Sequence, residues 1–343
     1  MIKWINEYLK HREFNVKING SLSESHEASS GIPQGSVLGP LLFIIFINDL
    51  PRACTDNYLY LFADDAKLFK IIRSILDAEI LNNDCKYMFE WCKNWSMNVN
   101  VSKCKVLSLH PNRSSENYDY SFQGNNSDEF LTHVEEYSDL GVLIDSKLSF
   151  KDHIHNMVNK ANRNLGLIRR NFNNIDIDSF KVLYFTLVRS NLEYCHSVWN
   201  PHTVELTEEL ENVQRRATKC IKNCKGLTYE ERLKYLNLPT LKYRRLRGDM
   251  IQVFKILNDY YPNCDIPQLT LRKDSHTRGH QLKLLVKRPK YDIRKYSFTI
   301  RVVNSWNALP AAAVTATSIN SFKAEFDNHY KNKDIYYNWR ASY

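Results

Sequence analysis

The chain has 343 residues, 43% of them hydrophobic and 25% charged, which is ample material for a packed core. Its longest apolar run, residues 41–47, is far shorter than the roughly 18 residues of a membrane span, and the N-terminus lacks the apolar core of a signal peptide. Residues 1–150 carry 14 Lys and Arg against 20 Asp and Glu, whereas residues 151–343 carry 33 against 18, a net charge of +15. We expect no membrane anchor, and a basic half that either contacts a polyanion or exposes solvated helix faces.

The first half of the chain alternates between helix and strand patterns. We expect helices over residues 4–12, 36–50 and 77–95, strands over 14–18, 103–110 and 137–145, and a hairpin over 58–72. The polar segment 111–129 has the composition of a surface loop.

From Ser149 onward the apolar spacing becomes helical. Ser149 and Asp152 can cap a helix over residues 150–172, and Thr228 and Glu231 have the capping-box spacing before a helix over 232–238. The same spacing predicts helices over 179–199 and 204–223. Three pairs of adjacent arginines on these helices suit contact with a phosphate backbone or with water equally well: Arg169-Arg170, Arg215-Arg216 and Arg244-Arg245.

Two adjacent acids, Asp64 and Asp65, interrupt the apolar run YLYLFADDAKLFKII at residues 58–72. The flanking segments have strand composition and Asp-Asp is turn material, so we expect both carboxylates at the tip of a hairpin with buried flanks. Negative charge is costly there unless a cation binds, and hard divalent cations, Mg²⁺ above all, take carboxylate oxygens. For these two acids alone, an ordinary surface turn is the alternative.

A constrained loop and an apolar helix precede the hairpin, in SGIPQGSVLGPLLFIIFINDLP at residues 30–51. In this loop Pro33 restricts the backbone, whereas Gly31 and Gly35 allow conformations that other residues disfavour. Ser36 can cap the helix, and Pro51 closes it. Residues 37–50 are nearly all apolar, so we expect the helix to be buried beneath the sheet that carries the hairpin. Gln34 and free backbone N–H groups at the positive end of the helix would then face a ligand.

Taken together, these two stretches indicate a particular protein family far more specifically than either stretch does alone. GIPQGSVLGPLLFIIFINDLP and FADD resemble the reverse transcriptase of non-LTR (LINE-type) retrotransposons, most like the jockey and CR1 group. NVNVSKCKVLSLH resembles the lysine-bearing segment that follows the hairpin, and LGVLIDSKLSFKDHI resembles the primer-gripping hairpin that leads into the thumb. FTIRVVNSWNALP and SINSFKAEFD resemble the C-terminal region of the same elements, so the resemblance covers essentially the whole chain.

The resemblance implies an α+β fold in three parts. Residues 1–148 would form a partial polymerase palm, an antiparallel sheet with packed helices. Residues 149–238 would form a helical thumb, and residues 239–343 a C-terminal helical region. In this family the fingers and the first palm strand, with another catalytic aspartate, lie upstream of the segment that residues 4–9 resemble. We therefore expect them to be missing from the chain that begins at Met1.

The resemblance also implies roles for individual residues. Asp64 and Asp65 would be catalytic and would help to hold two Mg²⁺ ions, with Asp64 the better candidate for direct ligation. The pocket for the templating base and the incoming deoxynucleoside triphosphate would be lined by Pro33, Gln34, Gly35 and Phe62. Lys103 would lie near the triphosphate as a catalytic cation, with Lys105, on the same strand face, as a weaker candidate. Leu140 and Gly141 would form the primer grip.

The expected activity is RNA-directed DNA synthesis, in which a nucleotide is transferred to the 3′ end of a DNA primer on an RNA template. For the chain as given we expect little or no synthesis, because a two-metal site needs more than two carboxylates. Two alternatives stay open: a non-catalytic nucleic-acid-binding protein that uses residues 151–343, and an inert remnant. The resemblance implies location in the nucleus or cytoplasm and says nothing of oligomeric state.

Overall fold

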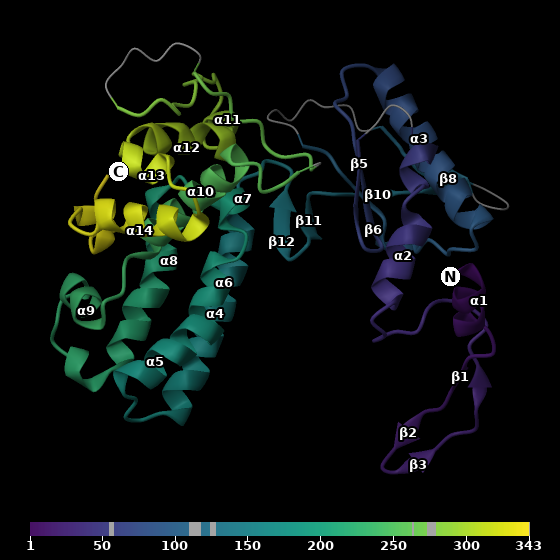
Figure 1. The fold of residues 1–343 in the computed structure, drawn as a ribbon, viewed down its shortest axis with the longest axis horizontal. Helices are drawn as coiled ribbons and strands as arrows, with labels where there is room; N and C mark the ends of the chain where they lie inside the picture. Colours follow the sequence, from purple (N-terminus) through teal and green to yellow (C-terminus); the bar gives the residue numbers. More distant parts are fainter. Residues whose placement is uncertain (55–57, 110–117, 124–127, 263, 273–278, 343) are drawn as a thin grey trace. The chain divides into compact units, whose positions relative to one another are not determined.

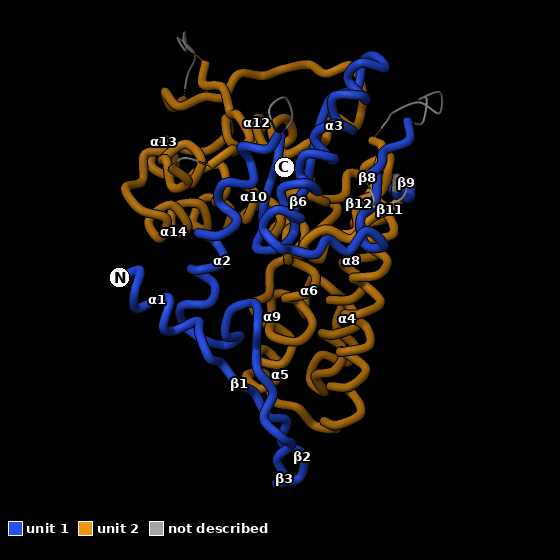
Figure 2. Tube along the Cα trace, turned by 90° about the vertical axis from the view of Figure 1, so that its right-hand side faces the viewer, with its two compact units in different colours: residues 1–106, 114–134 blue, residues 107–113, 135–343 orange. Residues whose placement is uncertain are grey.

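The computed structural model describes residues 1–54, 58–109, 118–123, 128–262, 264–272 and 279–342. The chain divides into two compact units, residues 1–106 with 114–134 (unit 1) and residues 107–113 with 135–343 (unit 2), coloured separately in Figure 2. Short strands and helices alternate in unit 1, whereas unit 2 is mainly helical (Figure 1). The predicted mixture of helix and sheet is confirmed. None of the helices in the described ranges has the length and apolar content to cross a bilayer.

The helices of unit 1 are α1 (Ile2–Leu9), α2 (Gly39–Ile47) and α3 (Ile75–Asn94), with 3-10 turns η1 (Leu50–Ala53) and η2 (Val101–Lys103). The strands up to residue 134 are β1 (Glu13–Phe14), β2 (Lys17–Ile18), β3 (Ser21–Leu22), β4 (His26–Glu27), β5 (Tyr58–Phe62), β6 (Asp65–Phe69), β7 (Lys105–Leu107), β8 (Ser121–Gln123), β9 (Asp128–Phe130) and β10 (Thr132–Val134). Within the described residues these strands pair only in twos, β1 with β4, β2 with β3, β5 with β6, β7 with β10 and β8 with β9.

Two strand predictions in this region need correction. The single strand expected over residues 14–18 is two short strands of a long hairpin, because the Ser23 hydroxyl accepts the Val16 N–H between them at 2.9 Å. The strand expected over residues 103–110 is only three residues long within its described part, residues 103–109, and is preceded by η2. The predicted loop 111–129 lies partly outside the described residues, and its described part contains β8 and the start of β9.

The helix α3 is the centre of packing in unit 1. Ser74 caps it and the backbone N–H groups of Arg73 and Ser74 donate to the Asp77 carboxylate, which lowers the pKa of that carboxyl below its usual range. Farther along, Trp91 and Trp95 make edge contacts with Phe46 of α2, with ring centroids 6.0 and 5.6 Å apart. These aromatic contacts hold α2 beside α3.

The prediction of a fully buried helix over residues 37–50 was wrong in two respects. The helix α2 is shorter, ending at Ile47, and Pro51 lies inside η1 instead of closing α2. Its side chains Leu41, Ile44 and Ile45 are 53, 57 and 64% exposed. The reason is geometric: a helix that is apolar all round must be packed against on every side, and Trp91 and Trp95 of α3 contact only the side of α2 that carries Phe46.

The elements of unit 2 begin with the hairpin β11 (Glu136–Asp139) and β12 (Val142–Asp145). Its helices are α4 (Lys151–Asn171), α5 (Ile177–Leu183), α6 (Ser190–Glu193), α7 (His196–Trp199), α8 (Val204–Ala217), α9 (Tyr229–Leu236), α10 (Leu241–Leu257), α11 (Asp292–Lys295), α12 (Phe298–Asn307), α13 (Ala311–Val314) and α14 (Ile319–Tyr330). A π-helical segment, η3 (Tyr184–Arg189), follows α5, and 3-10 turns are η4 (Thr218–Cys220), η5 (Lys222–Cys224) and η6 (Asp334–Tyr336).

The capping predictions had mixed outcomes. Thr228 and Glu231 form the predicted capping box at the start of α9. Ser149 and Asp152 do not cap α4 as predicted, since the carboxylate of Asp145 accepts the N–H groups of Ser149 and Phe150 at 3.1 and 2.7 Å. The helix expected over 179–199 is broken at Cys195, where φ is +53°.

Unit 2 contains two apolar cores. The first draws on residues between Val142 and Leu241, with α4 and α8 each contributing more of its buried side chains than any other element. The second draws on residues between Tyr243 and Ile335 and includes the fully buried rings of Trp306 and Phe322. The expected boundary at residue 148 thus lies inside unit 2, just after β12, and the change from one core to the other falls at the start of α10.

A glycine on α10 allows the close approach of α7. A Cβ atom added to Gly248 would lie 2.3 Å from the ring of His196, whereas one added to Gly166 of α4 would meet nothing within 4 Å. We expect Gly248→Ala to lower the free energy of unfolding by about 1–3 kcal/mol through overpacking. Gly166→Ala should instead raise it by about 0.5–1 kcal/mol through helix propensity. Urea unfolding of the two variants compares these outcomes, and equal midpoints would contradict the close contact.

Candidate polymerase site

The acid-tipped hairpin forms as predicted. Strands β5 and β6 pair antiparallel with Phe62 opposite Asp65, so that Ala63 and Asp64 are the two residues of the turn. Ala63 has φ of +50° and Asp64 does not have a positive φ, which is the sign pattern of a II′ turn. Asp64 therefore lies in the turn itself, and Asp65 is the first residue of the returning strand.

The flanks of the hairpin differ from the prediction. Alternate side chains of β5 lie on opposite faces. Leu59 and Leu61 are half-buried on one face, whereas Tyr58, Tyr60 and Phe62 are 61, 45 and 61% exposed on the other. Asp64 and Asp65 are themselves exposed. The tip therefore places two carboxylates in water beside an exposed aromatic face.

The loop before α2 has the expected constrained backbone. Gly31 and Gly35 have φ of +75° and +79°, a conformation that side chains disfavour. The Ser36 hydroxyl accepts the N–H of Gly39 at 3.0 Å and donates to the carbonyl of Pro33 at 2.8 Å, so it orders the approach to α2. The N-cap of α2 is Leu38, so the prediction that Ser36 occupies this position was wrong. Gln34, between these anchors, is exposed.

An arginine that the sequence did not single out also holds this loop. The Arg12 guanidinium donates to the carbonyl oxygens of Gly31 at 2.7 Å and Ser30 at 3.0 Å. The Nε–H of Arg12 also donates to the carbonyl of Leu9, at the end of α1, which helps to fix the position of the guanidinium. A lone arginine carries no pattern that spacing could reveal, so only the folded chain identifies it as a support of the loop.

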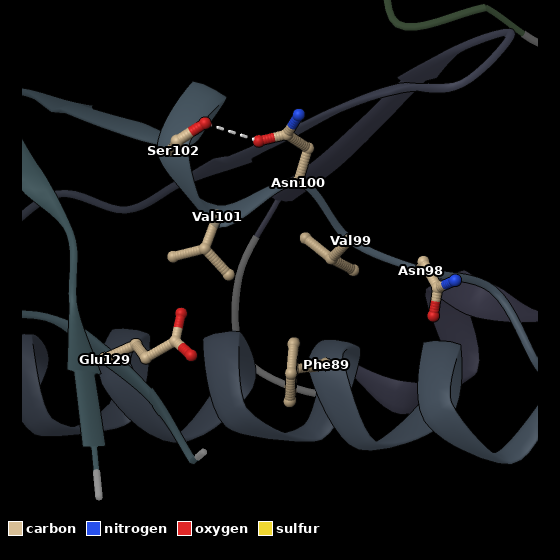
Figure 3. A pocket seen from close by; sticks show the side chains of 7 residues that line it. All are labelled: Phe89, Asn98, Val99, Asn100, Val101, Ser102 and Glu129. Carbon is tan, nitrogen blue, oxygen red and sulfur yellow. Dashed lines mark hydrogen bonds between the residues drawn. The ribbon is translucent and has the colours of Figure 1, made fainter. Parts of the chain in front are cut away.

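The two candidate lysines lie on different elements, which corrects the prediction that they share a strand face. Lys103 ends the 3-10 turn η2, and Lys105 begins β7. Both side chains are exposed. The residues just before Lys103 line an open hollow of about 630 Å³, in which Phe89 and Glu129 face Val99 and Val101 (Figure 3).

Leu140 and Gly141, the expected primer grip, form the two-residue turn between β11 and β12. Both have positive φ, +46° and +81°, as a type I′ turn requires. The Tyr194 hydroxyl donates to the carbonyl of Leu140 at 2.8 Å, and a Cβ atom on Gly141 would lie 3.5 Å from the same ring. This turn belongs to unit 2, whereas the hairpin tip, the loop and Lys103 belong to unit 1.

The structure brings the predicted site residues together in local sets. Asp64 and Asp65 share one turn, and residues 33–35 share one loop, but within the described residues no hydrogen bond or ion pair joins these sets to each other or to Lys103. Nor do three metal-ligating side chains gather anywhere in the described part of the chain. The two exposed carboxylates have the oxygen donors that a hard divalent cation takes, and they would supply two of its ligands.

The geometry and the two motifs define a class of protein. Residues 1–144 match the family described as reverse transcriptase (RNA-dependent DNA polymerase). This part of the chain, which holds the FADD hairpin and the Gly-rich loop, is therefore a reverse transcriptase domain, of the type found in jockey-like non-LTR retrotransposons.

Curated relatives extend the similarity beyond this domain. The RNA-directed DNA polymerase from mobile element jockey of Drosophila melanogaster is 30% identical over 161 residues, covering 45% of this chain and 17% of that protein. The corresponding jockey protein of Drosophila funebris is 24% identical over 277 residues, covering 77% and 29%. The probable RNA-directed DNA polymerase from transposon X-element is 24% identical over 228 residues, covering 64% and 25%. The chain thus spans less than a third of each of these relatives, and no solved structure matches it.

Proposed function

We propose that the chain contributes the palm and thumb of an RNA-directed DNA polymerase, which adds deoxynucleotides to the 3′ hydroxyl of a DNA primer on an RNA template and releases pyrophosphate. Residues 1–148 would be the palm part, 149–238 the thumb and 239–343 the C-terminal region. The observation that carries the proposal is the hairpin tip, where Asp64 lies in the turn with Asp65 beside it. The reverse transcriptase match of residues 1–144 supports it.

The exposed tip is suited to a site that opens to a large polyanionic substrate. Asp64 and Asp65 would hold divalent ions, which we propose to be two Mg²⁺, and such ions stabilise charge on the attacking and leaving oxygens when bound. Phe62, opposite Asp65 in register and 61% exposed, offers an aromatic surface next to the acids. Its place fits contact with a nucleotide.

The loop and the lysine would orient the other groups. Gln34 is exposed between two positive-φ glycines, so its amide and the nearby backbone can approach a base closely. Lys103 is exposed at the end of η2 and would neutralise or protonate the departing pyrophosphate. Leu140 and Gly141, whose turn is held by Tyr194, would position the primer end.

Primer extension tests the proposal. The described residues place two carboxylates at the tip, so we expect the 343-residue chain by itself to extend an RNA-templated primer weakly or not at all. A chimera in which the jockey polymerase segment that precedes its matched stretch is joined to Met1 should extend the primer when Mg²⁺ and the template are both present. A folded chimera that extends no primer would contradict the proposal.

A further inference from the structure

A basic segment of unit 2, residues 285–296, ends in the short helix α11 and is fixed at both ends. We call it the basic strap. Before it, the indole of Trp306 donates to the carbonyl of Leu282 at 2.8 Å, and the Asn307 amide both accepts the N–H of Leu284 and donates to its carbonyl, at 2.7 and 2.9 Å. At its far end, the ring of Tyr296 stacks on His202 with centroids 4.2 Å apart and planes at 11°. The strap is thus tied to the core while its middle faces water.

The cations of the strap differ from the paired arginines of α10 and α12. The strap carries five basic side chains, Lys287, Arg288, Lys290, Arg294 and Lys295, against the single acid Asp292. All five are exposed, and none has a carboxylate partner within the described residues. By contrast, Arg244 pairs with Glu193 at 2.7 Å and Arg301 with the buried Asp249 at 3.1 Å. Arg244 and Arg301 are therefore neutralised internally, whereas the charge of the strap faces solvent.

The strap also presents an aromatic ring and free backbone. Tyr291 is 59% exposed, and the ammonium of Lys290 lies 5.7 Å from its ring centroid. No backbone N–H of residues 286–290 donates to another described residue. An exposed ring among cations on an extended chain matches the two requirements of single-stranded nucleic acid, stacking for its bases and positive charge for its phosphates.

We propose that the basic strap binds single-stranded nucleic acid, with a base stacked on Tyr291 and phosphates contacted by Lys287, Arg288 and Lys290. A duplex would use the cations but would leave the ring without a base to stack on, because its bases already stack on each other. A membrane surface fits less well, since the only helix in the strap, α11, has four residues and cannot form an apolar face. This site belongs to unit 2, whereas the hairpin tip belongs to unit 1.

Fluorescence anisotropy of labelled oligonucleotides tests the site on the full chain. Tyr291→Ala should weaken binding of a single strand by roughly 5- to 100-fold, and Tyr291→Phe should retain it. Replacing Lys287, Arg288 and Lys290 with Gln should reduce the slope of log K against log salt by about 2, since each phosphate contact contributes about 0.7. The matched control replaces Lys219, Lys222 and Lys225, three exposed lysines of η4, η5 and the residue that follows, with Gln and should change the slope less.

RNA and DNA single strands are separate arms of the experiment, which identify the preferred sugar. The proposal is overturned if the strap triple variant and the control triple variant lower binding equally, or if Tyr291→Ala binds a single strand as the unchanged chain does. Equal losses on a duplex and on a single strand would also overturn it, as would strap-dependent binding to anionic vesicles in place of oligonucleotides. Because binding is the readout, the result does not depend on whether the polymerase site is active.

Discussion

Asp64→Asn is expected to abolish RNA-templated extension by the chimera, with a loss of roughly 10³-fold or more. The amide keeps the shape of the side chain but removes the charge that holds a divalent ion, and such ions contribute several kcal/mol to stabilising transition-state charge. Asp64 lies in a two-residue turn at an exposed tip, where its side chain makes no hydrogen bond to another described residue. The fold should therefore tolerate the change, and circular dichroism should be unaltered.

Two further variants make this test specific. Asp65→Asn should cost less than Asp64→Asn, because Asp65 lies on a strand and neighbouring side chains there face opposite ways. Glu79→Gln, which removes one exposed carboxylate from α3 at a distance in sequence, should leave extension unchanged. If Asp64→Asn retained extension while the chimera needed Mg²⁺, the metal assignment to this turn would be wrong.

Local patterns predicted local structure well. The hairpin at Asp64 and Asp65 follows from two apolar segments around turn residues, and the capping box at Thr228 follows from a spacing of three. Both depend on residues within a few positions of each other. The periodicity that predicts α3 and α4 is likewise a property of the helix itself.

Two kinds of feature could not be predicted in this way: burial by neighbouring elements, and contacts between residues far apart in the sequence. The composition of α2 indicates that it avoids water but does not say which elements are present to bury it, so the exposure of Ile44 and Ile45 was unforeseen. Arg12 supports the loop, and Asp145 accepts the backbone N–H of Phe150 just before α4. Both act through side chains whose type is common on any surface. The arginine pairs were ambiguous for the same reason, since only the fold shows that Arg244 faces a glutamate.

Asp249→Ala is expected to lower the free energy of unfolding of unit 2 by about 3–5 kcal/mol. The Asp249 carboxylate is buried, with its side chain 5% exposed, and it accepts two hydrogen bonds from the Arg301 guanidinium, both at 3.1 Å. It also accepts the Asn200 amide at 3.2 Å. These contacts join α10, α12 and the residue that follows α7, so the truncation leaves the charge of Arg301, 14% exposed, without its carboxylate partner.

The physical reason for this cost predicts how to remove it. A buried charge is destabilising chiefly when its partner is lost, and an apolar pair of similar volume often replaces a buried ion pair without penalty. Combining Asp249→Leu with Arg301→Met should therefore recover most of the stability that Asp249→Ala loses. Glu208→Ala, which breaks pairs with Arg215 and Arg340 at 38% exposure, should cost no more than about 1 kcal/mol. Urea unfolding followed by circular dichroism measures all three, and a small effect of Asp249→Ala would show that the helices of unit 2 do not depend on this buried charge.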